Sequence, residues 1–354
     1  MKKVGIMSMQ RIVNYGSFLQ AYGLKKIIES IGEYTVEFVD YKYEGALDKK
    51  RENKKSRLKR HLNPNYIPGK VYTKKCAKKL KNDLKNIGID EYNYHPNIDT
   101  LVIGSDEVFN CIQGYPVGYS RELFGKNYEE KRVISYAASF GYTTEKLLEK
   151  YGVADEVGNM LLKFYNISVR DQNSFDTIKK LTQREAQIHL DPVLMYDFKM
   201  EMKKYTVSEN GYIILYAYTN RLNKQEEKYI KAFAKKYNKK IYSVGNYNRI
   251  ADKNIICNPL KVFSLFRNAD YIITDTFHGT IFSVKTNSKF CTIVRDSNKN
   301  KLIALLKYLK KEDRIVNSIE DIEKLYNYNI EYSITNKIIE KERKKTILYL
   351  KENL

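Results

Sequence analysis

Short apolar runs alternate with amphipathic helical patterns along most of this chain. Lys3 to Ser8 (KVGIMS) is typical of a strand, residues 17–31 carry apolar side chains at helical spacing, and Gly32 is a typical helix end. Thr35 to Asp40 (TVEFVD) then predicts a second strand. Strand, helix, strand order of this kind predicts parallel sheets with right-handed crossovers, and does not predict a barrel or a sandwich.

The same alternation continues in two further series. Strands are expected at residues 100–104, 132–137 and 166–169, and then, after a polar stretch at 197–210, at 211–218, 241–244, 271–274 and 290–294. Helices are expected at residues 224–236, 278–284 and 299–309, with a terminal amphipathic helix over residues 332–350.

The length of 354 residues suggests two domains at roughly 150 residues each. We place the boundary near residue 205, which gives an N-terminal α/β domain (1–205), a C-terminal α/β domain (206–330) and a terminal helix (331–354). The expected fold is α/β, with two facing doubly wound, Rossmann-like domains. Ligands bind at the carboxyl ends of the strands in such folds, so functional residues are sought there.

Composition narrows the functional classes. The chain has 43% hydrophobic residues and only 6 Pro, which excludes a wholly disordered protein. Its apolar runs, such as 212–218, are far shorter than the ~20 residues of a membrane-spanning helix, and no signal peptide is expected. The four Cys and four His are scattered, so the sequence predicts no disulfide framework, metal site or bound cofactor, and a cytoplasmic location.

Positive charge is concentrated in one segment. The segment from Asp48 to Lys85 contains fifteen Lys and Arg and only three acidic residues. The net charge of the whole chain is +21. We expect this segment to be a helical insertion of the N-terminal domain that contacts an anionic membrane surface, at the inner face of the membrane. A compositional bias toward Lys is the alternative. No nucleic-acid-binding motif is present, so nucleic acid is not an expected partner.

The sharpest local pattern is YIITDTFHGTIFSV, residues 271–284. An apolar strand stops at Asp275, and Thr276, His278, Gly279 and Thr280 lie where the chain turns into a helix. Unpaired N–H groups and the helix dipole favour an anion at such a position. Thr276 is a candidate cap, and Gly279 would let the backbone approach a ligand. A capped helix with a surface histidine is the alternative.

Two more strand ends carry polar side chains. In NISVRDQNSF (166–175), Arg170 follows a short strand with its planar fork free for phosphate or carboxylate, unless it serves only in a cap and ion pair with Asp171. In LVIGSDEVFN (101–110), Ser105, Asp106 and Glu107 follow a buried strand. Asp106 is the better candidate for a base or a sugar-hydroxyl acceptor, with a turn-stabilising role equally open.

A fourth strand end, VNYGS at 13–17, has a single glycine. It lacks the dinucleotide fingerprint and the Walker phosphate loop, so NAD and ATP are not expected ligands.

Taken in order, these motifs resemble the polysaccharide pyruvyl transferases. The resemblance runs from MKKVGIMSMQRIVNYGSFLQAYGLKKII through LVIGSDEVFN, VISYAASFG, ISVRDQ and LDPVLMY to YIITDTFHGTIFSV. The chain departs from the family pattern at Ser17, Glu107, Phe109, Thr276 and Phe277. The resemblance implies a GT-B-like architecture, the arrangement of one major class of glycosyltransferases.

The resemblance also implies transfer of a pyruvyl group from phosphoenolpyruvate, as co-substrate, to two hydroxyls of a sugar in a polysaccharide or a lipid-linked precursor. Catalytic roles are expected for His278, Arg170 and Asp106. The expected donor-binding residues are Arg170, Thr276, His278, Gly279 and Thr280. The expected acceptor-binding residues are Asn14, Tyr15, Gly16, Ser17, Ser105, Asp106 and Glu107. A nucleotide-sugar glycosyltransferase and a non-catalytic binding protein are the alternatives.

Overall fold

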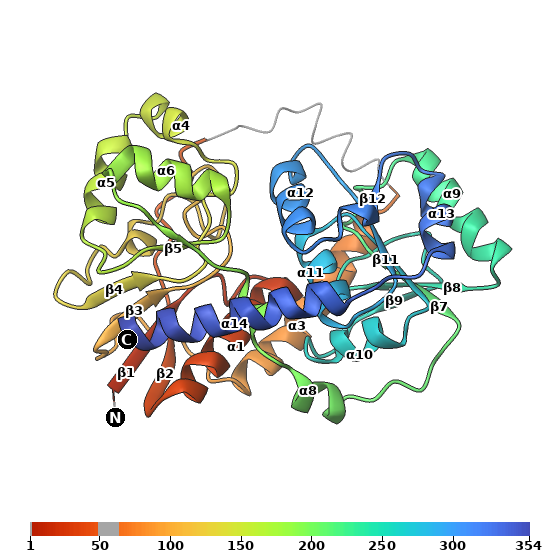
Figure 1. Cartoon of the computed structure of the whole chain (residues 1–354), viewed down its shortest axis with the longest axis horizontal. Helices are drawn as coiled ribbons and strands as arrows, with labels where there is room; N and C mark the ends of the chain where they lie inside the picture. Colours follow the sequence, from red (N-terminus) through yellow and green to blue (C-terminus); the bar gives the residue numbers. More distant parts are fainter. Residues whose placement is uncertain (1, 49–63) are drawn as a thin grey trace. The chain divides into compact units, whose positions relative to one another are not determined.

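The strands described by the computed structural model, which covers residues 2–48 and 64–354, all pair in parallel. The chain forms two compact units (Figure 1). The described residues of the first unit are 2–48, 84–197 and 340–354, and those of the second are 64–83 and 198–339. The predicted α/β class with parallel sheets and a C-terminal helix is therefore confirmed.

The first unit contains a four-stranded sheet in the order β2-β1-β3-β4, followed by the short pair β5-β6. Its elements are β1 (Lys2–Met7), α1 (Tyr15–Ile31), β2 (Tyr34–Val39), β3 (Thr100–Ile103), η1 (Arg121–Phe124), β4 (Arg132–Ser135), α4 (Glu145–Lys150), α5 (Ala154–Leu162), β5 (Ser168–Val169), α6 (Gln172–Thr182), β6 (Gln187–Ile188) and α7 (Pro192–Met195). The register pairs Gly5 with Leu101, and Leu101 with Val133.

The core of the first unit contains a cluster of packed phenylalanine rings. The Phe109 ring lies 4.9 Å from that of Phe124 and 5.2 Å from that of Phe140, and all three side chains are buried. Met7, Leu101 and other sheet residues join the same cluster. Val108 and Phe109, which follow the Asp106 turn, belong to this core and anchor the segment after β3.

The second unit is built on a six-stranded sheet in the order β12-β11-β10-β7-β8-β9. Its elements are α3 (Tyr66–Lys85, whose last two residues belong to the first unit), α8 (Lys199–Lys204), β7 (Tyr212–Tyr216), α9 (Lys224–Lys236), β8 (Lys240–Val244), β9 (Lys253–Ile255), α10 (Lys261–Asn268), β10 (Tyr271–Thr274), α11 (Phe277–Lys285), β11 (Phe290–Ile293), α12 (Lys299–Tyr308), η2 (Glu312–Arg314), β12 (Ile315–Val316) and α13 (Asp321–Asn327). The helix α14 (Ser333–Asn353) begins in the second unit and ends in the first.

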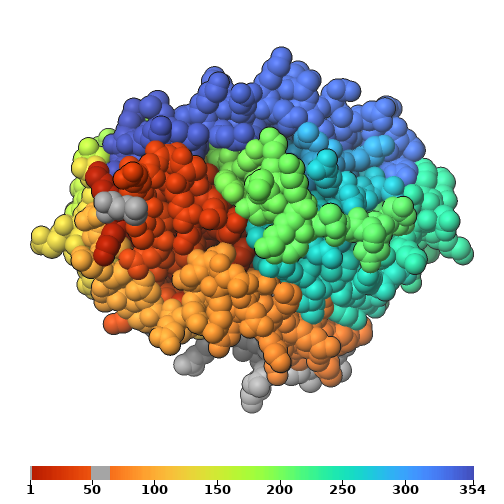
Figure 2. All heavy atoms as spheres, turned by 90° about the horizontal axis from the view of Figure 1, so that it is seen from below, coloured from red at the N-terminus to blue at the C-terminus, as the bar shows by residue number. Residues whose placement is uncertain are grey.

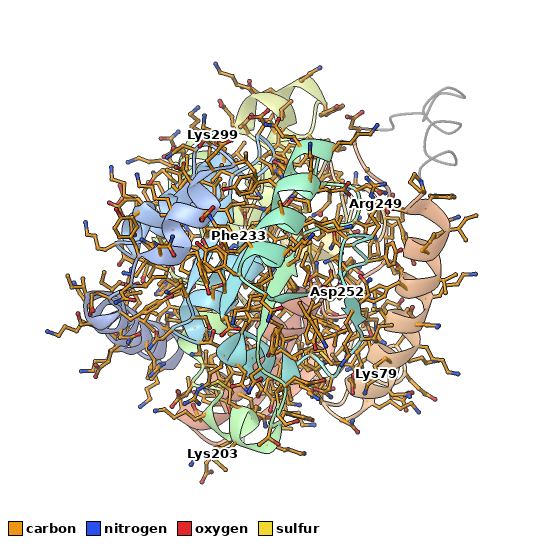
Figure 3. The ribbon with its side chains drawn as sticks, turned by 90° about the vertical axis from the view of Figure 1, so that its right-hand side faces the viewer. Lys79, Lys203, Phe233, Arg249, Asp252 and Lys299 are labelled. Carbon is orange, nitrogen blue, oxygen red and sulfur yellow. The ribbon has the colours of Figure 1, made fainter. Side chains whose placement is uncertain are left out.

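Alternate residues of the central strands face opposite sides of this sheet. Ile213 and Ile273 pack with Phe233 of α9, which points into the interior in Figure 3, whereas Arg249 lies at the surface. On the other side, the ring of Tyr216 lies 5.6 Å from those of Phe266 in α10 and Phe282 in α11. Helices therefore cover both faces, as a doubly wound sheet requires.

The unit boundaries differ from those expected from the sequence. The division falls after Asp197, before residue 205, because Phe198 packs on Phe263 of α10 at 4.5 Å between ring centroids. Residues 49–63 of the basic segment lie outside the described residues. The helix α3 groups with the second unit instead of the first, and Tyr72 donates a hydrogen bond to the carbonyl of Ile255 at 2.5 Å.

Two residues of the basic segment that are rare inside helices belong to this helix. Pro68 and Gly69 lie in the first turn of α3. Proline is tolerated there because the first backbone N–H groups of a helix have no partner within it. The polar stretch at 197–210 contains the short helix α8.

Candidate active site

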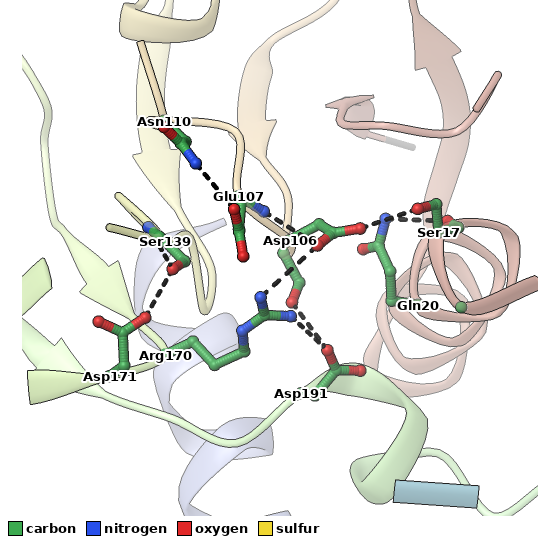
Figure 4. A network of polar contacts seen from close by, with 12 residues as sticks. Ser17, Gln20, Asp106, Glu107, Asn110, Ser139, Arg170, Asp171 and Asp191 are labelled. Carbon is green, nitrogen blue, oxygen red and sulfur yellow. Dashed lines mark hydrogen bonds and ion pairs between the residues drawn. The ribbon is translucent and has the colours of Figure 1, made fainter. Parts of the chain in front are cut away.

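The segments after β3, β5 and β6 bring Arg170 between two aspartates in the first unit (Figure 4). The Arg170 Nη1 lies 2.8 Å from Asp191 Oδ2, and its Nη2 lies 3.5 Å from Asp106 Oδ1. The Arg170 side chain is 4% exposed and that of Asp191 is fully buried. The sequence led us to expect a free guanidinium at Arg170. In the structure this guanidinium is instead paired with these two carboxylates.

Asp106 is held in an unusual backbone conformation by its neighbours. Its φ of 87° lies in the left-handed region that most side chains avoid. Ser17 donates a hydrogen bond to Asp106 Oδ2 at 2.9 Å, and the backbone N–H of Glu107 donates to Oδ1 at 3.0 Å. Strained, well-supported positions of this kind are common at functional sites, so the geometry suits a working carboxylate.

The charge around Arg170 is mainly negative. Burial disfavours its charged form, but Asp106, Asp191, Asp171 and Glu107 outweigh burial and raise the pKa of Arg170. This guanidinium is thus paired with two carboxylates and lies within electrostatic reach of two more. A further anion would be repelled here, whereas sugar hydroxyls could donate to carboxylate oxygens.

The other predicted acceptor residues surround this network or start α1. Ser105 donates to Asp191 at 3.3 Å, and Glu107 accepts a hydrogen bond from Asn110 at 2.8 Å. Asn14 caps α1 by accepting from the backbone N–H of Gly16 at 2.7 Å, and Tyr15 lies buried beside it. The structure therefore brings Ser17, Ser105, Asp106 and Glu107 together, with Asn14, Tyr15 and Gly16 in the turn that carries Ser17. Asp171 caps α6 and accepts from Ser139 at 2.6 Å, so it does not serve Arg170 as a direct partner.

In the second unit, the turn from β10 into α11 places His278 in the first turn of the helix. Thr276 caps α11 by accepting from the backbone N–H of Gly279 at 2.9 Å. The hydroxyl of Thr280 donates to the carbonyl of Thr276 at 3.0 Å and lies 3.0 Å from the hydroxyl of Thr292. His278 is 8% exposed. The hydroxyls of Thr276 and Thr280 are thus engaged within the unit.

Gly279 is required for the packing of α11. A Cβ at this position would lie 2.1 Å from Thr274 Oγ1 and 2.8 Å from Tyr216 Cδ1. Contacts that short do not occur, so any side chain at position 279 would push α11 away from β7 and β10. The structure thus gives Gly279 a packing role, and the ligand approach expected from the sequence stays a prediction.

Two arginines that we did not select as site residues from the sequence lie beside Asp275. Arg221, after β7, donates to the Asp275 carbonyl at 3.2 Å and to Ser297 at 3.0 Å. Arg295, after β11, lies 3.4 Å from Asp275 Oδ2 and binds both carboxylate oxygens of Glu226, at 2.7 and 3.0 Å. The strands β7, β10 and β11 are neighbours, so these cations and the N-terminus of α11 share one edge of the sheet. Arg295 immediately follows the strand expected at residues 290–294, which was a detectable signal.

The carboxyl group of Asp275 is a weaker acid than that of an ordinary aspartate. Burial raises the pKa of Asp275 to about 6, against the opposing effect of Arg221 and Arg295. A group of this pKa exchanges protons near neutral pH and could act as acid or base.

Comparisons with known proteins agree with this architecture. The family model "Polysaccharide pyruvyl transferase" matches residues 14–297. The chain belongs to the polysaccharide pyruvyl transferase family. This assigns it to the transferases, with a general role in polysaccharide pyruvylation. No curated protein is significantly similar to it.

Solved structures with a similar fold are distant in sequence. The chain resembles the UDP-GlcNAc 2-epimerase of Methanocaldococcus jannaschii in complex with UDP-GlcNAc and UDP, with 12% identity, a TM-score of 0.52 and 99% coverage of both chains. It also resembles that of Neisseria meningitidis, with 12% identity, a TM-score of 0.46, and coverage of 99% and 100%. The likeness at 0.52 confirms the predicted GT-B-like fold.

Removing the Arg170 guanidinium should destabilise the first unit. Arg170→Ala leaves Asp106 and Asp191 as buried carboxylates without their cation, which costs on the order of 3–5 kcal/mol of unfolding free energy. Lys179→Ala removes an exposed ion pair with Glu185 and should cost under about 1 kcal/mol. Urea denaturation of both variants measures the change in unfolding free energy. Similar small decreases in both variants would show that the buried ion pairs do not hold the strand ends together.

Asp275 should make stability fall as pH rises. Its pKa is about 6 in the folded chain, against an ordinary value of 3.8 for an aspartate in water, so the folded state binds more protons between these values. Asp275→Asn removes the cost of burying a charged carboxylate. The stability of this variant relative to the parent, followed by the melting temperature, should therefore rise between about pH 4 and pH 7. The limit of this gain in unfolding free energy is on the order of 3 kcal/mol. Asp296→Asn, at an exposed neighbouring aspartate, is the control. A pH-independent difference would contradict the raised pKa.

Proposed function

We propose that this protein transfers a pyruvyl group from phosphoenolpyruvate to two hydroxyls of one sugar, forming a ketal and releasing phosphate. The observation that carries the donor assignment is the cluster of His278, Arg221 and Arg295 at one sheet edge of the second unit. Phosphoenolpyruvate is a compact polyanion, and two guanidiniums with a helix N-terminus suit it.

Charge supports a division of roles between the two units. Arg170 is surrounded by four carboxylates, which disfavour a polyanion. We therefore assign the donor to the second unit, with Arg221 and Arg295 as anion contacts, and the acceptor hydroxyls to the first unit. Arg170 then positions Asp106 and Asp191 instead of binding the donor.

The proposed chemistry has three steps. A proton adds to the methylene carbon of phosphoenolpyruvate, and the neighbouring carbon, which carries the phosphate, becomes electrophilic. One sugar hydroxyl attacks that carbon and gives up its proton to a base. The bond to the phosphate oxygen then breaks as the second hydroxyl attacks the same carbon, and the proton of this hydroxyl passes to the departing phosphate. His278 is our candidate for the acid or phosphate partner, and Asp106 or Asp275 for the base.

A melting experiment tests donor binding before any acceptor is known. Phosphoenolpyruvate should raise the melting temperature by a few degrees without added metal, because a ligand at 100 times its Kd stabilises by about 2.7 kcal/mol. Arg221→Ala should reduce the shift, whereas Arg249→Ala, at an exposed arginine paired with Glu227, should not. His278→Ala should lower phosphate release with a competent glycan by on the order of 10²-fold.

The opposite results separate the alternatives. A shift with UDP and none with phosphoenolpyruvate would favour a nucleotide-sugar glycosyltransferase. Silence toward both ligands would favour a non-catalytic binding protein.

We also propose that α3 brings the protein to an anionic membrane surface, where a lipid-linked acceptor would lie. Tyr72, Cys76 and Leu80 form the buried stripe of this helix. Its exposed lysines are Lys70, Lys74, Lys75, Lys78, Lys79, Lys81 and Lys85. Figure 2 shows α3, in orange, at the surface. Ile67 and Val71 are also exposed, at 70% and 48%. Among the described residues, no helix has the length and apolar character needed to cross a bilayer.

Vesicle sedimentation tests this surface. Each lysine near an anionic bilayer contributes about 1 kcal/mol, so binding to phosphatidylserine vesicles should weaken steeply with salt. Changing Lys74, Lys78 and Lys81 to Glu should abolish binding. The same change at Lys341, Lys344 and Lys351 of α14 should have a smaller effect. Equal binding to neutral vesicles, or none at low salt, would leave only the compositional explanation.

A further inference from the structure

Five tyrosines line one pocket of about 420 Å³ in the first unit. They are Tyr41, Tyr43, Tyr92, Tyr94 and Tyr115. The pocket lies at the carboxyl ends of β1 and β2, since residues 8–13 follow β1 and residues 40–43 follow β2. A volume of this size is within the ~300–1,000 Å³ range of small-molecule sites.

Four of the five tyrosines are among the exposed large side chains of the described residues. Tyr115 is 79% exposed and Tyr92 is 67% exposed. The rings of Tyr92 and Tyr94 stack at 5.6 Å between centroids, and Tyr43 meets Tyr115 edge-on at 5.2 Å. Aromatic surface that stays in water and converges on one hollow is typical of a binding site.

An ion pair holds the floor of the pocket in place. Arg11 donates to both carboxylate oxygens of Asp40, at 2.5 and 2.7 Å, and also to the carbonyl of Glu91 at 2.6 Å. The backbone N–H of Asn93 donates to Asp40 at 2.9 Å, and the guanidinium of Arg11 lies 4.4 Å from the Tyr92 ring centroid. These bonds anchor the segment that carries Tyr92 and Tyr94. The pocket is therefore preformed before a ligand binds.

The charge of the lining narrows the class of ligand. The only charged side chains among the described lining residues, Arg11 and Asp40, neutralise each other. The pocket therefore offers no spare cation for phosphoenolpyruvate or a nucleotide diphosphate. The phenol groups of its five tyrosines also disfavour a purely aliphatic chain. The ligand class that fits this lining is neutral and has both apolar faces and hydroxyl groups. A pyranose ring has these properties.

The pocket adjoins the Asp106 network. Ser8 lines the pocket and donates to the carbonyl of Ser105 at 2.8 Å. Burial chiefly raises the pKa of Tyr41, and the carboxylates of Asp40 and Asp106 raise it further, so Tyr41 lies within electrostatic reach of Asp106. A ring bound here would lie next to the strained carboxylate.

We infer that this tyrosine pocket binds a neutral sugar residue of the acceptor glycan. The inference rests on the proposed function, because it takes the first unit as the acceptor side. The tyrosine rings stack on the C–H faces of the pyranose, while phenol groups of the lining exchange hydrogen bonds with its hydroxyls. This adds a subsite to the residues near Asp106 and makes the pocket a determinant of acceptor specificity.

Saturation-transfer NMR with methyl glycosides of glucose, galactose, mannose and N-acetylglucosamine tests the inference. At least one glycoside should receive saturation from the full-length protein. The double variant Tyr92→Ala with Tyr115→Ala should weaken its binding on the order of tenfold. The double Phe variant should bind nearly as well as the parent, because it keeps the rings. Tyr328→Ala, at a 56% exposed tyrosine of the second unit, is the matched control.

Two results would overturn the inference. One is the absence of saturation transfer to every glycoside in the parent protein, and the other is undiminished binding in the double Ala variant. The melting shift with phosphoenolpyruvate, measured on the same variants, should be unchanged, which also shows that they fold. Loss of that shift in every protein, with sugar binding intact, would refute the proposed donor and leave the sugar pocket standing.

Discussion

Parallel strand pairing is the constraint on which the rest of this structure depends. Each parallel strand must be followed by a crossover, so every strand of a sheet ends at the same edge and releases its chain there. Residues that are far apart in sequence, such as Arg221, Asp275 and Arg295, therefore meet after three neighbouring strands. Backbone hydrogen bonding, and not any local motif, creates the positions where chemistry can be assembled.

Charge distinguishes the two sheet edges. In the first unit Arg170 is outnumbered by carboxylates and serves to hold Asp106 and Asp191 in place. In the second unit, two guanidiniums and the start of α11 surround Asp275, whose burial brings its pKa to about 6. One edge is suited to hydroxyl groups and the other to an anion. This contrast, together with membership of the pyruvyl transferase family, supports the assignment of acceptor and donor.

Fixed ion pairs recur beneath the surfaces that we assign to ligands. Arg170 is locked between two aspartates, Arg295 binds Glu226 through two bonds, and Arg11 binds Asp40 in the same way. A guanidinium has five donors in a rigid plane, so it can hold two or three loops at once. The loops after parallel strands would otherwise be the least constrained parts of each unit, and these arginines order them before any ligand arrives.

Much of the fold was determined by the sequence alone, because it depends on local periodicity and capping. The helix predicted at residues 224–236 has those bounds in the structure, where Asn223 and Glu226 form a capping box. The strand ends bearing Asp106, Arg170 and Asp275 were also predicted from apolar runs that stop at polar residues. What tertiary structure decided was the partner of each group. Asp191 meets Arg170 only because β5 and β6 pair, and the tyrosine pocket draws on four separate segments. Pairing, burial and the resulting charge depend on distances in space, which the order of residues along one chain does not specify.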